Sequence, residues 1–422
     1  MGASKNFNWK IVVIFFILVL FANGTGVLSA TDIRGKSYSL SEILVIAKEK
    51  NPSRAIFQAN VETARGKFTQ ARAYPNPELE TAIGRGEGLD EPGTSYKREF
   101  SLGLSQVFEW PGKRFYRSKA AEALVDVARL DIENFQLDLL AEVKDAFYYV
   151  LLSNQLLEVS EKNVETSKTL LTSVKLRVDL GDAPELELIK AKVELLKATK
   201  DLKRAENKKT IAKAVLNSIL GGTLEEGYEI SDGFTRPEKN FDLPSLVKTA
   251  LIQHPIILRQ KKVLVAAGNE LLGERQSLVP DLTVNGSVSE EVDKRSFAVG
   301  LSLSLPLFYL RSGEIAVALA EQKRAKAEFE RIRLELTKLI TLEFHNYQIG
   351  LDQLRIFEEG LLEQADEALR ITRFSYEQGE SDLINLLDAQ RIQRITFSEY
   401  YEAQFELQSA LVRLERVTGG LP

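Results

Sequence analysis

Apolar and polar residues alternate in four short segments of this chain. In the clearest segment the odd positions are Phe297, Val299, Leu301, Leu303 and Leu305, with alanine, glycine and serine between them. Residues 100–105 alternate in the same way, and weaker alternation covers residues 79–84 and 282–288. A period of two predicts β-strands with one apolar and one polar face. Such strands suit a membrane β-barrel, and they suit a soluble sheet with one wet face equally well.

Helical periodicity covers most of the remaining sequence. Between residues 188 and 219 apolar residues recur at alternating spacings of three and four, with Lys209 as the polar interruption. The positions are Leu188, Ala191, Leu195, Ala198, Leu202, Ala205, Ala212, Leu216 and Ile219. A repeat of 3.5 residues predicts a left-handed coiled coil. The register returns 198 residues later, from Leu386 to Val417. An ordinary amphipathic helix would use the same residue types but would not explain this duplication.

Landmarks of the sequence also recur in a fixed order. Asn51-Pro52 returns as His254-Pro255 after 203 residues, and Leu220-Gly221-Gly222 returns as Thr418-Gly419-Gly420 after 198 residues. Each unit is far longer than a solenoid repeat, so the pattern predicts a duplicated module of domain size. The expected domains are a first repeat over residues 31–222, an inter-repeat linker over 223–242 and a second repeat over 243–422.

Each repeat is predicted to contain a bent helix, two strands and a long helical hairpin. The first helix begins at Ser39 or Asp242 and bends at Pro52 or Pro255. The expected long helices cover residues 113–178 and 313–378, and after a glycine turn the return helices cover 184–219 and 382–417. At 1.5 Å per residue a long helix reaches on the order of 100 Å. The fold is therefore predicted to be mainly α with a small β part.

The first thirty residues have the features of a secretory signal peptide. Lys5 and Lys10 precede an apolar run from Ile11 to Phe21, and small residues follow up to Ala30. The alternative is a membrane anchor, but the run is shorter than the roughly 20 residues of a spanning helix. We therefore expect a signal peptide within residues 1–30, cleaved after Gly26, Ser29 or Ala30, and an exported remainder.

Composition excludes several classes of function. The 422 residues include no cysteine, two histidines and one methionine, the initiator. Thiolate metal sites, disulfides and cysteine nucleophiles are thus excluded, and no cofactor is expected. The 55 basic and 60 acidic residues give no electrostatic reason to bind nucleic acid. No phosphate-binding glycine loop or Ser–His–Asp arrangement was found, so an enzyme is not expected.

The number of strands bears on assembly. Four strands cannot close a barrel, since about eight is the minimum, and open edges cannot face hydrocarbon. If the strands cross a membrane, several chains share one barrel: two chains give eight strands and three give twelve. The competing interpretation is a soluble periplasmic coiled-coil adaptor, but adaptors usually carry one hairpin rather than two equal halves.

From about Ser37 to Gly420 the chain resembles the TolC-type outer-membrane efflux proteins. The duplicated order, the turn Phe108-Glu109-Trp110-Pro111-Gly112-Lys113-Arg114 and the segment from Gly379 to Gln390 carry this resemblance. It implies a homotrimer with a twelve-stranded barrel in the lipid of a Gram-negative outer membrane, and a periplasmic tunnel of coiled-coil helices. It also implies a periplasmic adaptor (membrane fusion) protein and an inner-membrane pump as partners.

The branch and the cargo are also expectations from this resemblance. The turn, with Gln106 before it and Arg117 after it, is most similar to the cobalt–zinc–cadmium and copper resistance branch. A passive exit duct for heavy-metal cations is therefore favoured. A drug-efflux or type I secretion channel is the alternative.

The resemblance further implies two sites near the glycine turns. The adaptor-docking tip would comprise Leu180, Gly181, Asp182, Gly379, Glu380, Ser381 and Asp382. The channel gate would comprise Asp388, Asn385, Glu187, Tyr376 and Arg177. Three Asp388 carboxylates around a threefold axis would attract cations. In the plainer alternatives the glycines are helix caps, Asp382 caps the returning helix, and Asp388 lies on a solvated helix face.

Overall fold

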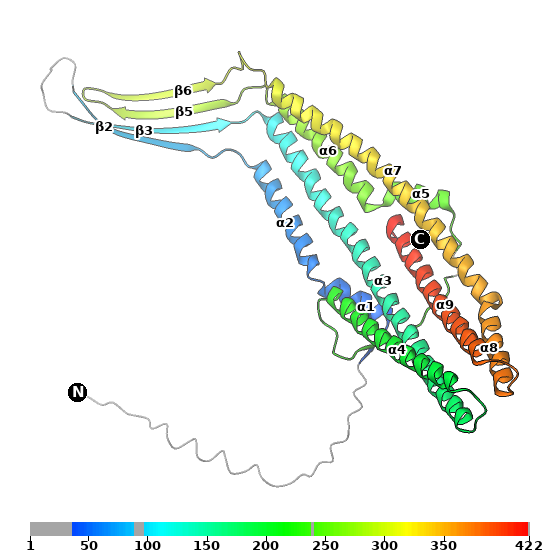
Figure 1. Cartoon of the computed structure of the whole chain (residues 1–422). Helices are drawn as coiled ribbons and strands as arrows, with labels where there is room; N and C mark the ends of the chain where they lie inside the picture. The colour runs from blue at the N-terminus through cyan, green and yellow to red at the C-terminus, as the bar shows by residue number, and fades with distance from the viewer. Residues whose placement is uncertain (1–35, 88–96, 238–239, 421–422) are drawn as a thin grey trace, which may run out of the picture.

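The structure consists of two similar halves in which long helices extend from one four-stranded sheet (Figure 1). The computed structural model describes residues 36–87, 97–237 and 240–420. The expected signal peptide at residues 1–30 lies outside this described part. The elements of the first half are β1 (Ser37–Tyr38), α1 (Leu40–Lys50), α2 (Ser53–Arg72), β2 (Glu78–Gly86), β3 (Lys97–Phe108), α3 (Pro111–Asp179) and α4 (Glu185–Ile219).

The second half repeats this order. Between the halves lies β4 (Glu229–Ile230), and the second half contains α5 (Leu243–Gln253), α6 (Pro255–Gln276), β5 (Leu282–Glu290), β6 (Arg295–Leu303), α7 (Ser312–Ile356), a π-helical turn (Phe357–Leu361), α8 (Leu362–Glu377) and α9 (Leu383–Thr418). The predicted mainly α fold, with a duplicated order of elements, is confirmed.

The first helix of each half begins at a capping side chain, as predicted. The Ser39 hydroxyl accepts the backbone N–H of Glu42, and the Glu42 carboxylate accepts the N–H of Ser39 at 2.8 Å, which completes a capping box. Asp242 caps α5 through a 3.0 Å hydrogen bond. Both helices then break before Pro52 and Pro255, because the residue preceding a proline disfavours helical geometry.

The sheet is antiparallel, with strand order β2-β3-β5-β6. Its register pairs Leu79 with Leu104, Phe108 with Leu282 and Leu282 with Leu303. Because side chains alternate along a strand, this register gathers the apolar positions of all four strands on one face. That apolar face carries Leu79, Thr81, Ile83, Phe100, Leu102, Leu104, Phe108, Leu282, Val284, Val288, Phe297, Val299, Leu301 and Leu303. The opposite face is mainly serine, glycine, alanine, threonine and glutamate.

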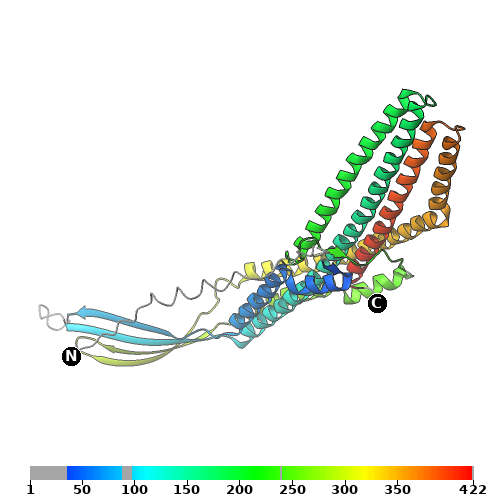
Figure 2. The same ribbon diagram turned by 90° about the horizontal axis from the view of Figure 1, so that it is seen from below.

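The helices form a wall one helix thick that leads away from the sheet (Figure 2). Near the sheet the neighbours are α2, α3, α6 and α7, in that order; farther away they are α4, α3, α9 and α8. Helix α3 runs through both levels with 69 residues. The far ends form a first hairpin, α3 with α4, and a second hairpin, α8 with α9. Within the described residues, no helix has the length and apolar character needed to cross a membrane.

The alanine positions of the predicted coiled-coil seam are buried in the first hairpin. Ala191, Ala198, Ala205 and Ala212, spaced seven residues apart, are each at most 8% exposed. Small side chains at one position per heptad let the helix axes approach closely. A close approach also occurs between α7 and α9, where a Cβ added at Gly350 would lie 3.1 Å from the backbone of the facing helix.

Two related apolar cores lie where α1 and α5 cover the wall. The first is centred on Phe147 and Leu216, and the second on Ile340 and Leu407. The inter-repeat linker belongs to the first of these packing units, because Tyr228 is buried there and β4 pairs in parallel with β1. The linker is therefore packed against the first repeat along this stretch.

The long helix of the second half differs from the expectation of one helix over residues 313–378. Helix α7 ends at Ile356, and the π-helical turn separates it from α8. Within that turn Gly360 has φ 144°, which side-chain-bearing residues rarely adopt. Arg236 of the linker pairs with Glu358 at 2.5 Å and thereby ties the linker to this kink. A glycine inside the helical pattern was the available signal.

Candidate functional site

The two predicted tip turns have the same backbone geometry. Gly181 has φ 84° and Gly379 has φ 80°. In the first turn the N–H of Asp182 donates to the Arg177 carbonyl at 2.8 Å; in the second, the N–H of Glu380 donates to the Ser375 carbonyl at 2.9 Å. Each turn is a Schellman motif, in which glycine supplies the left-handed residue that closes the helix end.

The tip residues are accessible. Leu180, Gly181, Asp182, Gly379, Glu380 and Asp382 are exposed, and Ser381 is half-buried. Asp382 occupies the N-cap position of α9, but its side chain makes no capping hydrogen bond, so the alternative role of a side-chain cap is not supported. The sequence reasoning missed an apolar rim of Leu176, Leu186 and Phe374 beside the turns. Their exposure shows that the tips are not uniformly polar.

Three of the five predicted gate residues meet just above the tips. The Tyr376 hydroxyl lies 3.2 Å from the Glu187 carboxylate, and the Arg177 guanidinium lies 4.8 Å from the centre of the Tyr376 ring. Arg177 also approaches the Tyr376 carbonyl at 3.5 Å. Burial, assisted by the negative charge of Glu187, raises the pKa of Tyr376, so its hydroxyl stays a donor at neutral pH. This group joins α3, α4 and α8.

The other two predicted gate residues lie elsewhere on the second hairpin. Asp388 is exposed on α9 and forms an ion pair with Arg391 one turn later. The amide of Asn385 donates to the Ser381 hydroxyl at 3.3 Å. Among the residues described, no hydrogen bond or ion pair joins Asp388 or Asn385 to the group around Tyr376. A single subunit therefore does not assemble all five residues.

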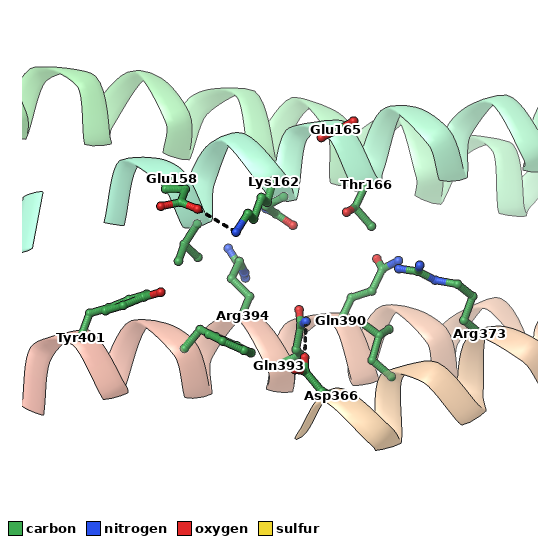
Figure 3. Close-up of a pocket in the computed structure, with 14 residues that line it drawn as sticks. Glu158, Lys162, Glu165, Thr166, Asp366, Arg373, Gln390, Gln393, Arg394 and Tyr401 are labelled. Carbon is green, nitrogen blue, oxygen red and sulfur yellow. Dashed lines mark hydrogen bonds and ion pairs between the residues drawn. The ribbon is translucent and has the colours of Figure 1, made fainter. Parts of the chain in front are cut away.

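The contact between the hairpins changes character with distance from the tips. Close to the tips Leu170, Val174, Tyr376, Leu383 and Leu386 pack in an apolar cluster contributed by both hairpins. Farther up, a cavity of about 390 Å³ lies between α3 and helices α8 and α9 (Figure 3). Its polar lining includes Glu158, Lys162, Asp366, Arg373, Gln393 and Arg394. Beside this cavity Arg394 of α9 pairs with Asp201 of α4 at 3.5 Å, so a polar contact also joins the hairpins there.

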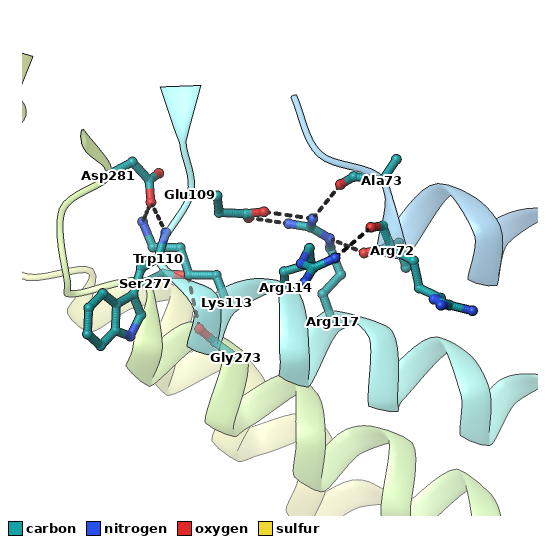
Figure 4. Close-up of polar contacts among 11 residues, drawn as sticks. Arg72, Ala73, Glu109, Trp110, Lys113, Arg114, Arg117, Gly273, Ser277 and Asp281 are labelled. Atoms are coloured by element: carbon teal, nitrogen blue, oxygen red, sulfur yellow. Dashed lines mark hydrogen bonds and ion pairs between the residues drawn. The ribbon is translucent and has the colours of Figure 1, made fainter. Parts of the chain in front are cut away.

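The turn between β3 and α3 ties the sheet to the helical wall (Figure 4). Arg117 forms a two-pronged ion pair with Glu109 and donates to the carbonyl of Ala71 at 3.0 Å, which fixes the end of α2. On the second half, Asp281 accepts hydrogen bonds from Lys113 Nζ and from the Trp110 N–H, both at 2.8 Å. These contacts connect both halves at one level.

No metal centre is evident in the described part of the chain, where no group of three or more His, Asp or Glu side chains has suitable geometry. The two histidines serve other purposes. His254 is buried, accepts the N–H of Ile256 at 3.1 Å and lies 3.2 Å from the Arg416 carbonyl. His345 is exposed beside Gln348.

Known proteins are similar to this chain in sequence. The cobalt-zinc-cadmium resistance protein CzcC of Cupriavidus metallidurans is 24% identical over 392 residues, which cover 90% of each chain. The pyoverdine export outer membrane protein OpmQ of Pseudomonas putida is 24% identical over 413 residues, which cover 91% of this chain and 86% of OpmQ. Both relatives are matched over nearly their whole length.

This chain is also similar to solved structures and matches a family model. The channel CusC superposes with a TM-score of 0.80 at 18% identity, covering 92% of this chain and 94% of CusC. The outer-membrane channel OprN gives 0.78 at 20% identity, covering 90% of each chain. Residues 43–222 and 246–420 match the family model described as outer membrane efflux protein. The resemblance seen in the sequence is thereby confirmed, and the chain belongs to the outer membrane efflux protein family.

Proposed function

We propose that three copies of this chain form a passive exit duct in a Gram-negative outer membrane, from the periplasm to the exterior. The observation that carries this proposal is the exposed apolar face of the sheet, on which Phe297 is 74% and Leu301 69% exposed. A continuous apolar face of this size requires a cover, and hydrocarbon supplies one. Strands of nine to twelve residues have the length of membrane strands.

The edges of the sheet are the reason to expect several copies of the chain to associate. Strands β2 and β6 are its outer strands, and each leaves one row of backbone groups that pair with no other strand among the described residues. Unpaired backbone groups are too costly to expose to hydrocarbon, so neighbouring copies pair with these edges. Three copies give twelve strands, and their one-helix-thick walls close into a tunnel continuous with the barrel. Glycine, alanine and serine on the opposite face of the sheet leave the lumen open.

We assign the gate and the docking tip by position. The contacts of Tyr376 with Glu187 and Arg177 hold the two hairpins together beside the tips, so opening requires these contacts to break. Asp388 and Asn385 face the lumen from α9. The exposed turns around Gly181 and Gly379 dock a periplasmic adaptor, and an inner-membrane pump supplies cargo and energy. The chain itself carries out no chemical reaction and holds no cofactor.

Heavy-metal cations are the proposed cargo. Support comes from relatives named for metal resistance, among them CzcC and the nickel-cobalt-cadmium resistance protein NccC of Alcaligenes xylosoxydans, to which the chain is 24% identical. OpmQ has the same identity and is named for export of pyoverdine, so an organic cargo is the second candidate. Growth of a deletion strain on cobalt, zinc and cadmium, with and without the restored gene, separates the two cargo classes.

Fractionation and particle mass test the duct itself. We expect the protein in the outer-membrane fraction, and we expect the detergent-solubilised particle to have the mass of three chains. A detergent-independent monomer in the soluble fraction would contradict the proposal.

The role of Asp388 is tested by Asp388→Ala in planar-bilayer recordings. Loss of a lumenal carboxylate is expected to lower the preference for cations. Asp352→Ala is a matched control, because Asp352 forms the same type of exposed pair with Arg355 on α7. Equal ion selectivity of the two variants would remove Asp388 from the gate.

A further inference from the structure

The two sides of the strand–helix turn after β3 are chemically different. Phe108 lies on the apolar face of the sheet, and continued alternation places Trp110 on that side and Glu109 on the other. Glu109 pairs with Arg117, whereas Trp110 donates through its indole N–H to Gln276 at 2.9 Å. The side that carries Trp110 is therefore continuous with the surface that faces hydrocarbon under the proposed function.

A shallow depression lies on the Trp110 side, directly beyond the end of the strands. Its volume is about 630 Å³, and its lining includes Arg72, Trp110, Gly112, Arg114, Phe115 and Tyr116. The end of α2, the start of α3 and the end of α6 meet there. Trp110 and Phe115 are 43% and 55% exposed. Aromatic side chains with one polar edge, such as those of Trp110 and Tyr116, favour the boundary between hydrocarbon and water.

Two guanidinium groups in this depression lack an acidic partner. Within the described residues neither Arg72 nor Arg114 forms an ion pair with a carboxylate. Arg114 lies 4.0 Å above the ring of Tyr74 and donates to the Arg72 carbonyl at 3.3 Å, and Arg72 lies 5.3 Å from the ring of Phe68. These contacts orient both side chains and leave their charge uncompensated.

The neighbouring basic residues show that only part of this turn carries uncompensated positive charge. Lys113 and Arg117 lie on the same first turns of α3, and each has a carboxylate partner, Asp281 and Glu109 respectively. The uncompensated positive charge is thus confined to the side of α3 that carries Trp110. A guanidinium group binds phosphate with two parallel hydrogen bonds, which suits a phosphodiester at this depth.

We propose that Arg72 and Arg114 bind the phosphate of an anionic glycerophospholipid in the leaflet nearest the helices, with Trp110 and Phe115 against its glycerol and upper acyl chains. The inference rests on the proposed function, because it requires the apolar face of the sheet to lie in the membrane. Apolar contact and phosphate recognition occur side by side in the depression, which favours a lipid over a free anion.

Trp110 provides a fluorescent probe within the site. The chain has two tryptophans, so a Trp9→Phe background leaves Trp110 as the single indole whether or not the leader is cleaved. The detergent-solubilised particle is titrated with phosphatidylglycerol brominated on its acyl chains, or with the equally brominated phosphatidylcholine, and Trp110 quenching is recorded. We expect phosphatidylglycerol to quench at about tenfold lower concentration, as for one to two charge-assisted contacts at a partly exposed site.

Paired substitutions locate the source of this preference. Arg72→Gln with Arg114→Gln is expected to abolish the preference for phosphatidylglycerol. Arg54→Gln with Arg129→Gln removes two charges from the same two helices far from the turn, and should preserve it. If the first double variant does not fold, the unsubstituted particle still tests the proposal, because equal quenching by the two lipids would contradict it.

Several outcomes would overturn the proposal. One is equal quenching by both lipids in the unsubstituted particle. Another is a preference for phosphatidylglycerol that survives the loss of Arg72 and Arg114. A third is abolition of this preference by inorganic phosphate at the lipid's concentration. Failure of both lipids to quench would show that lipid does not reach the depression. In each case a detergent-dependent particle of three chains would leave the proposed duct intact.

Discussion

The hydroxyl of Tyr376 lies 3.2 Å from the carboxylate of Glu187, although 189 residues separate them, and this contact joins the second hairpin to the first. Tyr376→Phe removes the donor and keeps the buried ring. A net hydrogen bond contributes about 1 kcal/mol, so we expect the population with separated hairpins to rise about fivefold. Open probability in bilayer recordings measures this change.

Tyr149→Phe serves as the control for that substitution. Tyr149 lies on α3, and its ring packs edge-on against Phe405. The hairpin contact has no gating role if the two variants open equally often.

The Glu109–Arg117 pair should stabilise the junction of sheet and helices more than a surface pair does. Glu109 is only 11% exposed, and Arg117 also donates to the end of α2. Glu109→Gln is expected to cost about 1–2 kcal/mol, because it leaves a guanidinium without its charged partner. Thermal unfolding followed by circular dichroism should show a lower midpoint.

An exposed pair on the same helix provides the comparison. Lys119 and Glu122 form an i,i+3 pair with both side chains about half exposed. Glu122→Gln should change stability by less than about 0.5 kcal/mol. If both glutamate variants melt at the same temperature, the junction pair contributes no more than a surface contact.

Two glycine-to-alanine substitutions should have opposite signs. A Cβ at Gly350 would meet the Leu407 backbone at 3.1 Å and its side chain at 3.2 Å, so Gly350→Ala must push α7 from α9 at a cost of about 1–3 kcal/mol. At Gly66, within α2, a Cβ would meet no atom within 4 Å, and alanine should stabilise that helix by about 0.5–1 kcal/mol. Melting curves of the two variants, recorded in parallel, test both expectations. A stabilising effect of Gly350→Ala would contradict the close packing of α7 against α9 at this residue.

Stability should depend on pH through His254. Burial lowers the pKa of His254 below its usual 6.5, because the charged ring loses contact with water. The neutral ring accepts the Ile256 N–H at the start of α6. The unfolded chain therefore binds more protons between the folded pKa and 6.5. The contribution of His254 is fully present above pH 6.5 and declines as the pH falls toward the folded pKa.

Denaturant titrations between pH 5 and 8 measure this dependence. His254→Asn retains a capping side chain and should flatten the profile in that range. His345→Asn, at the exposed histidine, should leave the profile as it is. A profile that His254→Asn does not alter would assign the pH dependence to other groups.

The sequence predicted the architecture because its signals are local. Capping residues at Ser39 and Asp242 and breaks at Pro52 and Pro255 set the helix ends, and the alternation from Phe297 set a strand face. The kink at Gly360 was not predicted, because a single glycine is tolerated in a helical pattern and its positive φ appears only in the structure, where Arg236 of the distant linker pairs with Glu358.

The candidate site was less predictable because its contacts are long-range. The pairing of Tyr376 with Glu187 depends on how the two hairpins align, which no local pattern encodes. By contrast, the Asp388–Arg391 pair spans three residues on one helix and could have been found by spacing alone. Arg72 at the end of α2 and Arg114 at the start of α3 could be assigned to one side of the molecule only when the register of the sheet separated its two faces.

The outer strands β2 and β6 also determine how a defective copy of the chain would affect pores that contain it. Once β2 and β6 are joined to other copies within lipid, a subunit could depart only by stripping nine-residue strands of their partners in hydrocarbon. Exchange after insertion should therefore be negligible, and the composition of each pore is decided at biogenesis. A faulty copy made beside a sound one would persist in mixed pores for their lifetime, and at equal expression it would enter most of them.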